Sequence, residues 1–389
     1  MTKLSICIPV EPGNPPPVRL ATELLHNAAS DIEIIVAPYG DTCADADELY
    51  ALAEKDARLR ILPAAPLGIS AANLWIGTVA AMAGEWVTVV RPNDILDPDV
   101  ALFIAYAEEA VPGLDAYGWN SFQIDAAAPR HISACVAIPI QHHTLEISKD
   151  DMLETFFQWK DSSNVPKMPF GIYHAAIKRS LLEAVLANSG ERSWLTAYPQ
   201  YEWSARVLLY AAKLGFPSRP LSASDVRPYQ PVEAPSAVEG FPFNSSIGVT
   251  AAIAETQARV LHDLNIEWSG FNDNFIRACM LDCMFVHDET AFEEKAQAYY
   301  AAICDLEGGR LAPSFRPPYL PEPQADPRRG LHGRVLLVNR FIGNAVTAEE
   351  FFKLVRTMLT PVHLVKDVLD ELPVSTVAAN IALSGSHAA

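Results

Sequence analysis

The stretch GEWVTVVRPNDILDPD, residues 84–99, is the part of the sequence that decides the fold. Residues 86–90 form a β-branched, apolar run that is short for a helix and long enough for a buried strand. Residues 91–94, RPND, follow as a polar turn, because proline and asparagine end a strand. Asp97 then fits the N-cap of a helix, with Pro98 at its first helical position. The stretch predicts a buried strand that leads into a polar turn, which is where α/β enzymes bind ligands.

The residues before this stretch alternate between apolar runs of strand length and helical patterns. We expect strands over 4–10, 32–36 and 60–62, and helices over 19–29, 44–57 and 68–83. This order is the pattern of a parallel sheet covered by helices. After it, residues 115–124 alternate enough to form a strand with 131–140 as its partner, and 218–231 contains the last strand and its loop.

The composition changes after this α/β pattern. Prolines and small residues over 230–246 indicate a linker, so we predict an α/β domain over 1–235 and a mainly helical region over 236–389. Predicted elements of this region are helices over 245–266, 272–305 and 347–360, a strand over 334–339 and an extended proline-rich segment over 313–329. Thr347 and Glu350 have the spacing of a capping box at the start of the last helix.

The charge and the cysteines limit the classes of function and location. The chain has 47 acidic and 29 basic residues, a formal net charge of −18, which argues against nucleic acid as a partner. The six cysteines are scattered, as is typical of reduced thiols in a cytoplasm. No secretion signal is recognisable, and no apolar run approaches the roughly 20 residues that span a bilayer. We therefore expect a cytoplasmic protein without a transmembrane segment.

Residues 1–230 resemble family 2 glycosyltransferases of the GT-A fold. The matching stretches are SICIPV (5–10), IEIIVAPYGDT (32–42), AEKDARLRIL (53–62), LGISAANLWIG (67–77), GEWVTVVRPNDILDPD (84–99), MPFGIYHAAIKRSLLEAV (168–185) and YPQYEWSARVLLYAAKLG (198–215). The resemblance implies a GT-A-like α/β fold with a mostly parallel sheet and flanking helices. It also implies transfer of a sugar from a nucleotide-sugar donor to a glycan or glycoconjugate acceptor, as in bacterial polysaccharide assembly.

The positions that bind the donor in that family hold unusual residues here. The resemblance places donor contacts at Pro9, Glu11, Tyr39, Asp41, Asn73, Arg91, Asn93 and Asp94. Tyr39 would stack on the nucleotide base. In the degenerate form of the family's metal-binding D-x-D motif, Asp94 keeps the carboxylate and is the candidate ligand for Mg²⁺ or Mn²⁺.

Arg91 has two interpretations at this position. Its guanidinium can replace the metal and bind the diphosphate of the donor in a bidentate manner. Alternatively, it pairs with Asp94 or Asp97 and leaves no donor site.

The family's catalytic acid pair falls on Pro199 and Gln200, so Glu202, the nearest acid, is the candidate general base. Arg206 lies four residues further on and offers a structural alternative, an i, i+4 ion pair. His174 is the candidate on the acceptor side, against the alternative of a packed histidine. Two functions remain open: a glycosyltransferase with a rewired donor site, and a catalytically inactive GT-A-like binding or scaffolding protein.

Overall fold

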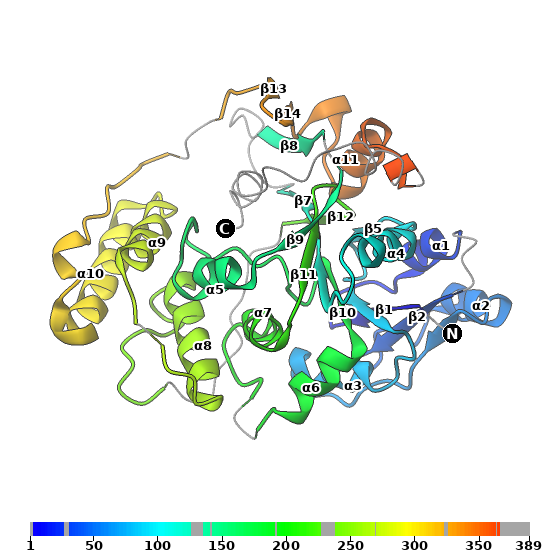
Figure 1. Ribbon diagram of the computed structural model, residues 1–389, viewed down its shortest axis with the longest axis horizontal. Coiled ribbons are helices and arrows are strands. Elements are labelled where there is room, and N and C mark those ends of the chain that lie inside the picture. Colours follow the sequence, from blue (N-terminus) through cyan, green and yellow to red (C-terminus); the bar gives the residue numbers. More distant parts are fainter. Residues whose placement is uncertain are drawn as a thin grey trace.

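The computed structural model describes residues 3–26, 31–125, 135–140, 142–190, 193–226, 238–268, 270–322, 326–362 and 364–365. Its centre is an eight-stranded sheet with the order β3-β2-β1-β4-β10-β6-β11-β9 (Figure 1). These strands are β1 (Leu4–Val10), β2 (Ile32–Pro38), β3 (Leu59–Ile61), β4 (Trp86–Val89), β6 (Ala116–Gly118), β9 (Thr144–Ile147), β10 (Ala175–Lys178) and β11 (Leu214–Pro217). Only β10 and β9 run against the others in this sheet. The mostly parallel α/β sheet is therefore confirmed.

Helices cover both faces of the sheet. Successive residues of β1 point to opposite faces, so that Ile6 and Ile8 join one core cluster and Cys7 joins the other. The first cluster is closed by α1 (Val18–Leu25), α2 (Asp47–Lys55) and α4 (Val100–Ala110). The second is closed by α3 (Ala71–Val79), α5 (Lys149–Phe157), α6 (Arg179–Ala187) and α7 (Pro199–Tyr210). Burial on both faces explains why β1 and β2 are continuous apolar runs rather than alternating ones.

Two small sheets lie beside the large one, and they correct two predictions. Residues 115–124 form two strands, because β6 ends at Gly118 and β7 (Ser121–Ile124) belongs to the sheet β5-β12-β7, with β5 (Ile95–Leu96) and β12 (Ser222–Asp225). The expected partner of this segment is also wrong: β8 (Cys135–Pro139) pairs with β14 (Val335–Asn339). The strand over 334–339 is thus confirmed, with β13 (Gly330–His332) as its other neighbour. Residues 131–134 lie outside the described ranges.

The C-terminal region is mainly helical and shares its core with the sheet domain. It contains α8 (Val249–Asp263), α9 (Asp273–Met284), α10 (Glu289–Asp305) and α11 (Ala348–Val355), with short 3-10 helices at Leu306–Gly309, Ala312–Ser314, Ile342–Asn344 and Arg356–Met358. One core cluster contains Val87 of β4, Leu208 of α7, Ile253 of α8 and Phe275 of α9. Figure 1 shows α8, α9 and α10 beyond α7, and α11 near β7 and β12. The predicted boundary near residue 235 stays a prediction, and part of the expected linker, 230–237, lies outside the described ranges.

The ends of two helices test the predicted caps. The capping box of Thr347 and Glu350 is present at the start of α11 and confirms that prediction. The predicted start of α4 is wrong, because this helix begins at Val100 with Asp99 at its N-cap. Asp97 instead accepts a hydrogen bond from the Asp99 backbone nitrogen at 3.1 Å and forms an ion pair with Arg219.

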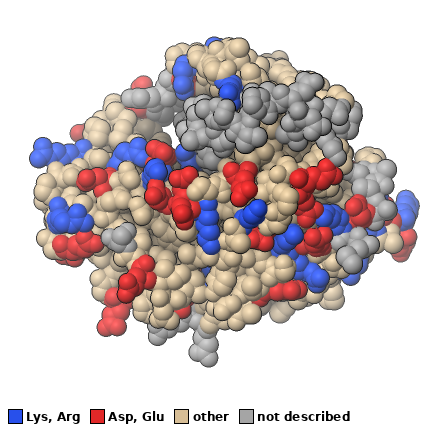
Figure 2. Space-filling model, in the orientation of Figure 1, with Lys and Arg blue, Asp and Glu red and all other residues tan. Residues whose placement is uncertain are grey.

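The surface carries both signs of charge. Figure 2 shows acidic and basic side chains interspersed on the face that it presents, without one basic patch there. None of the described helices is long and apolar enough to cross a membrane.

Candidate functional site

Three predicted donor-site residues follow neighbouring strands at the same edge of the sheet. Glu11 follows β1, Tyr39 follows β2 and Arg91 follows β4. The three strands are adjacent and parallel, so their carboxyl ends meet. Backbone hydrogen bonds extend the pairing into the loops: Tyr39 N donates to Val10 O at 3.1 Å, and Val90 N donates to Cys7 O at 2.8 Å.

The turn after β4 is held from two sides. The backbone nitrogen of Asp94 donates to the carbonyl of Arg91 at 3.1 Å and closes the turn. Arg19 of α1 donates from Nη2 to the carbonyls of Asn93 and Asp94 at 3.2 and 3.3 Å. The side chains of Arg91 and Asp94 therefore project from a fixed backbone.

Arg91 lies against an aromatic ring from a distant segment. Its guanidinium carbon is 4.4 Å from the centroid of the Tyr173 ring, the geometry of a cation–π contact. Burial lowers the pKa of this guanidinium, but Asp94 and Tyr173 together with Glu11 raise it above its ordinary value. Trp75 of α3 meets the Tyr173 ring edge-on, with centroids 6.0 Å apart. The site thus contains a fixed cation on an aromatic platform.

His174, next to that platform, is held in an unusual backbone conformation. Its φ is +61°, in the left-handed region that non-glycine residues rarely adopt. Its carbonyl accepts a hydrogen bond from Trp119 N at 3.0 Å, and its Nδ1 lies 2.8 Å from Ser222 Oγ. Burial, and then the charge of Arg91, lowers the pKa of His174 to about 3, so the imidazole is neutral at pH 7.

The surroundings of Asp94 do not fit a divalent cation. Asp94 is only 4% exposed, and the positive charge of Arg91 already interacts with its carboxylate. In the described ranges, no three His, Cys, Asp or Glu side chains are grouped so that they could hold a metal ion. Mg²⁺ and Mn²⁺ prefer several oxygen ligands, and a fixed guanidinium beside one carboxylate repels them.

The other predicted donor contacts lie at different depths around this edge. Pro9 is buried in β1, in register with Ala37 of β2. Tyr39 is half-buried and its hydroxyl accepts a hydrogen bond from Gly68 N at 2.5 Å. Asp41 and Asn73 are exposed. Their roles as donor contacts remain predictions.

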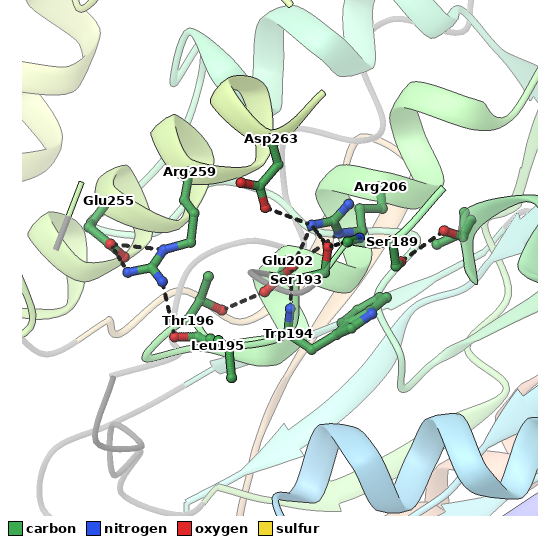
Figure 3. Close-up of polar contacts among 12 residues, drawn as sticks. Ser189, Ser193, Trp194, Leu195, Thr196, Glu202, Arg206, Glu255, Arg259 and Asp263 are labelled. Atoms are coloured by element: carbon green, nitrogen blue, oxygen red, sulfur yellow. Dashed lines mark hydrogen bonds and ion pairs between the residues drawn. The ribbon is translucent and has the colours of Figure 1, made fainter. Parts of the chain in front are cut away.

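Glu202, the predicted general base, lies in α7 and is completely buried. Figure 3 shows its polar contacts. Its Oε1 accepts hydrogen bonds from Trp194 N at 2.7 Å and from Arg206 Nε and Nη2 at 3.0 and 2.7 Å. Its Oε2 accepts one from Thr196 Oγ1 at 3.1 Å. The alternative i, i+4 ion pair with Arg206 is therefore present, though in the interior. The role of general base stays a prediction, and it would require this network to open.

The network around Glu202 joins α7 to α8, as Figure 3 shows. Arg206 Nη2 also reaches Asp263 Oδ2 of α8 at 3.3 Å. On α8, Arg259 pairs with Glu255 and donates to the Leu195 carbonyl at 3.4 Å. This set of charges fastens the first helix of the C-terminal region to the sheet domain.

The sequence did not indicate some of the residues that the site contains. Tyr173 adjoins His174, so an aromatic side chain beside a candidate histidine was the available signal. Trp119 and Ser222 gave no such signal, because they reach His174 only through the folding of three separate segments.

No protein-family model matches the sequence, and no curated protein matches it. Among solved structures, the chain is similar to S. aureus TarS 1–349 in complex with UDP-GlcNAc, with 11% identity over 78% of this chain and 82% of that chain and a TM-score of 0.47. It is similar to the mannosyltransferase PcManGT from Pyrobaculum calidifontis in complex with GDP-Man and Mn²⁺, with 11% identity over 78% and 75% of the two chains and a TM-score of 0.43. A mycobacterial protein matches at 13% identity over 69% and 77%, with a TM-score of 0.36. The mostly parallel α/β architecture rests on the strand order and registers given above rather than on these similarities.

Proposed function

We propose that this chain is a glycosyltransferase-like protein that binds a nucleotide-sugar donor at the carboxyl ends of β1 and β4 and transfers the sugar to a glycan or glycoconjugate acceptor. The observation that carries the proposal is the position of Arg91. Its guanidinium is fixed over Tyr173, directly after the strand where the family that the sequence resembles holds a metal. A planar guanidinium suits a diphosphate, because it donates parallel hydrogen bonds to phosphate oxygens.

The same guanidinium has a role in the transfer step. When the bond from the sugar to the diphosphate breaks, negative charge grows on the leaving phosphate oxygen. A cation that is already in place stabilises this charge without reorganisation, and it does so more in the transition state than in the ground state. Arg91 thus stabilises the leaving diphosphate in place of a metal ion, and transfer is independent of Mg²⁺ and Mn²⁺.

The remaining donor contacts follow from the positions of the predicted residues. Tyr39 stacks on the base, while Asp41 and Asn73 contribute polar contacts at the exposed rim of the same edge. Glu202 remains the predicted base for the acceptor hydroxyl.

The second candidate function is nucleotide-sugar binding without transfer. It is favoured by the interior position of Glu202, whose two oxygens are occupied by donors from within the chain. In this case the donor site acts as a binding module.

Isothermal titration calorimetry with UDP, GDP and their sugar conjugates tests the donor site. We expect binding that persists in EDTA, does not increase with Mn²⁺ and weakens about tenfold or more in Arg91→Ala, as for a lost hydrogen bond to a charged group. Arg179→Ala is the matched control, because it removes an exposed guanidinium from α6. Release of nucleoside diphosphate in the presence of glycan acceptors then separates transfer from binding alone. Absence of binding by every nucleotide would overturn the proposal.

A further inference from the structure

The Nδ1 atom of His174 belongs to a hydrogen-bond network that also contains Ser222 and Trp119. Ser222 Oγ lies 2.8 Å from His174 Nδ1 and accepts a hydrogen bond from Trp119 Nε1 at 3.0 Å. Ser222 is only 2% exposed, so its hydroxyl must be satisfied within the protein. Within the ranges that the structure describes, these two groups are the hydroxyl's hydrogen-bond partners.

This hydrogen-bond network determines which nitrogen of His174 carries the proton. An indole N–H only donates, so it uses a lone pair of the Ser222 oxygen. The hydroxyl hydrogen then has one acceptor left, His174 Nδ1. If Nδ1 carried the proton instead, the hydroxyl hydrogen would be buried without an acceptor, which is strongly unfavourable. His174 is therefore the Nε2–H tautomer.

A backbone hydrogen bond also holds His174. Trp119 donates to the His174 carbonyl from its backbone and to Ser222 from its indole, so it holds the His174 backbone directly and the ring through Ser222. The left-handed φ of +61° is maintained by these contacts. Strained conformations of this kind persist where the surrounding structure over-determines them, and they cluster at ligand sites.

The charges around His174 indicate what it can bind. The charge of Arg91, after β4, acts on the imidazole, and the Tyr173 ring contacts both the Arg91 guanidinium and the His174 ring, whose centroid is 6.4 Å away. Glu11 and Asp94 act on Arg91 and Tyr173. A neutral imidazole that already carries a proton on Nε2 cannot deprotonate an acceptor hydroxyl, but it can donate a hydrogen bond. Beside a guanidinium, an anionic oxygen is a favourable acceptor for such a bond.

We propose that His174 binds the diphosphate of the donor as a neutral Nε2–H hydrogen-bond donor, next to the guanidinium of Arg91. The proposal rests on the proposed function, and it moves His174 from the acceptor side to the donor side of the site. Arg91 then donates to a phosphate oxygen from the turn after β4, and His174 donates from the segment before β10. Tyr173 orients the guanidinium, and Ser222 orients the imidazole.

Calorimetry with pyrophosphate and UDP on the full chain tests the ligand. We expect His174→Asn to weaken binding about tenfold, because its amide does not reach the place of Nε2. His174→Gln, whose amide nitrogen approximates that place, should bind within about threefold of the wild type. His262→Asn, at an exposed position of α8, is the matched control and should bind as the wild type does. Thermal unfolding of each variant verifies that it folds.

NMR of protein with ¹⁵N-labelled histidine rings tests the proton position without any ligand. We expect His174 to show a protonated Nε2 and an unprotonated Nδ1, unchanged between pH 5 and pH 8, with its signals identified by their loss in His174→Asn. A protonated Nδ1, or an imidazolium at pH 7, would overturn the inference. So would nucleotide binding that is equal in the wild type and His174→Asn, and that result leaves the proposed function intact. Absence of binding by the wild type would overturn the proposed function, and with it this ligand, while the NMR result would still decide the tautomer.

Discussion

The guanidinium of Arg91 and the ring of Tyr173 lie 4.4 Å apart and join two segments that enter the site from opposite directions along the sheet. Arg91 follows β4, whereas Tyr173 precedes β10, the antiparallel neighbour of β4. The end of one strand therefore lies beside the start of the other. This arrangement explains how a cation and its aromatic platform come together from distant parts of the chain.

The first prediction concerns this platform. Tyr173→Leu removes the ring and leaves the guanidinium without the cation–π contact, which is worth about 0.5–2 kcal/mol. Tyr173→Phe keeps the ring and loses only the hydroxyl. We expect the affinity for UDP to fall several-fold more in the leucine variant than in the phenylalanine variant, measured by calorimetry. Equal losses in the two variants would show that the ring does not orient Arg91.

The main sheet could be predicted because its signals are local. β1, β2 and β4 are apolar runs ended by turn residues, and burial on both faces is what such runs indicate. The predicted start of α4 is wrong by a few residues. The carboxylate of Asp97 forms an ion pair with Arg219, and local propensity cannot reveal such a long-range contact.

The candidate site was predictable only in part, because several of its contacts join segments that are distant in the sequence. Arg91 and Asp94 could be found from the turn that contains them, since strand ends in a parallel sheet share an edge. The interior position of Glu202 could not be predicted, because the i, i+4 spacing between Glu202 and Arg206 is the same on a surface helix as on a buried one. The contact between Ser222 and His174 depends on the placement of β12, which belongs to another sheet.

The second prediction separates a structural from a catalytic role of Glu202. Glu202→Ala leaves the buried guanidinium of Arg206 with Asp263 as its remaining carboxylate, at 3.3 Å. Removing one partner of a buried pair destabilises a protein by about 3–5 kcal/mol. We expect a loss of this size in urea unfolding. Glu183→Ala, which breaks the exposed pair with Arg179, is the control and should change stability by less than about 1 kcal/mol.

If Glu202 acts as the general base instead, the pattern is different. Transfer would be lost in Glu202→Ala while the free energy of unfolding stayed close to that of the wild type. Such a result would contradict the structural role and support the predicted role of Glu202 as the general base.

The third prediction concerns the buried pair of Asp97 and Arg219, 2.9 Å apart. In Arg219→Met, Asp97 keeps a second cation, Arg356, at 3.6 Å. In Asp97→Asn, the buried guanidinium of Arg219 loses its carboxylate partner and keeps, among the described residues, carbonyl acceptors such as that of Thr360 at 3.1 Å. Asp97→Asn should therefore be the more destabilising of the two, by up to about 3–5 kcal/mol.

A double-mutant cycle measures the coupling of this pair. The double variant should lose less stability than the sum of the single losses, because neither buried charge is left alone. Chemical unfolding of the four proteins gives the coupling energy. Additive losses would mean that Arg356 and the carbonyls, rather than the pair itself, determine the stability here.

The fourth prediction is a decrease of stability in mild acid through His142. Its Nδ1 accepts a hydrogen bond from Thr360 N at 3.2 Å, and its Nε2 lies 2.9 Å from the carbonyl of Pro139. The ring must be neutral to accept at Nδ1. Burial, followed by the charges of Arg219 and His143 against the opposing Pro139 contact, lowers the pKa of His142 to about 4.

The direction of the effect follows from proton linkage. Between the folded pKa and an unfolded value of about 6.5, the unfolded chain binds more protons than the folded protein. The contribution of His142 is thus complete above about pH 6.5 and is lost as the pH falls toward 4, at most about 3 kcal/mol in all. His142→Asn offers no titrating ring, so its free energy of unfolding should fall less between pH 7 and pH 5 than that of the wild type. Because other groups titrate in the same range, the difference between the two slopes, rather than either slope alone, measures His142. Equal slopes would mean that folding does not lower the pKa of His142, so that the ring would take up a proton in the folded protein as readily as in the unfolded chain and lose the hydrogen bond from Thr360 N.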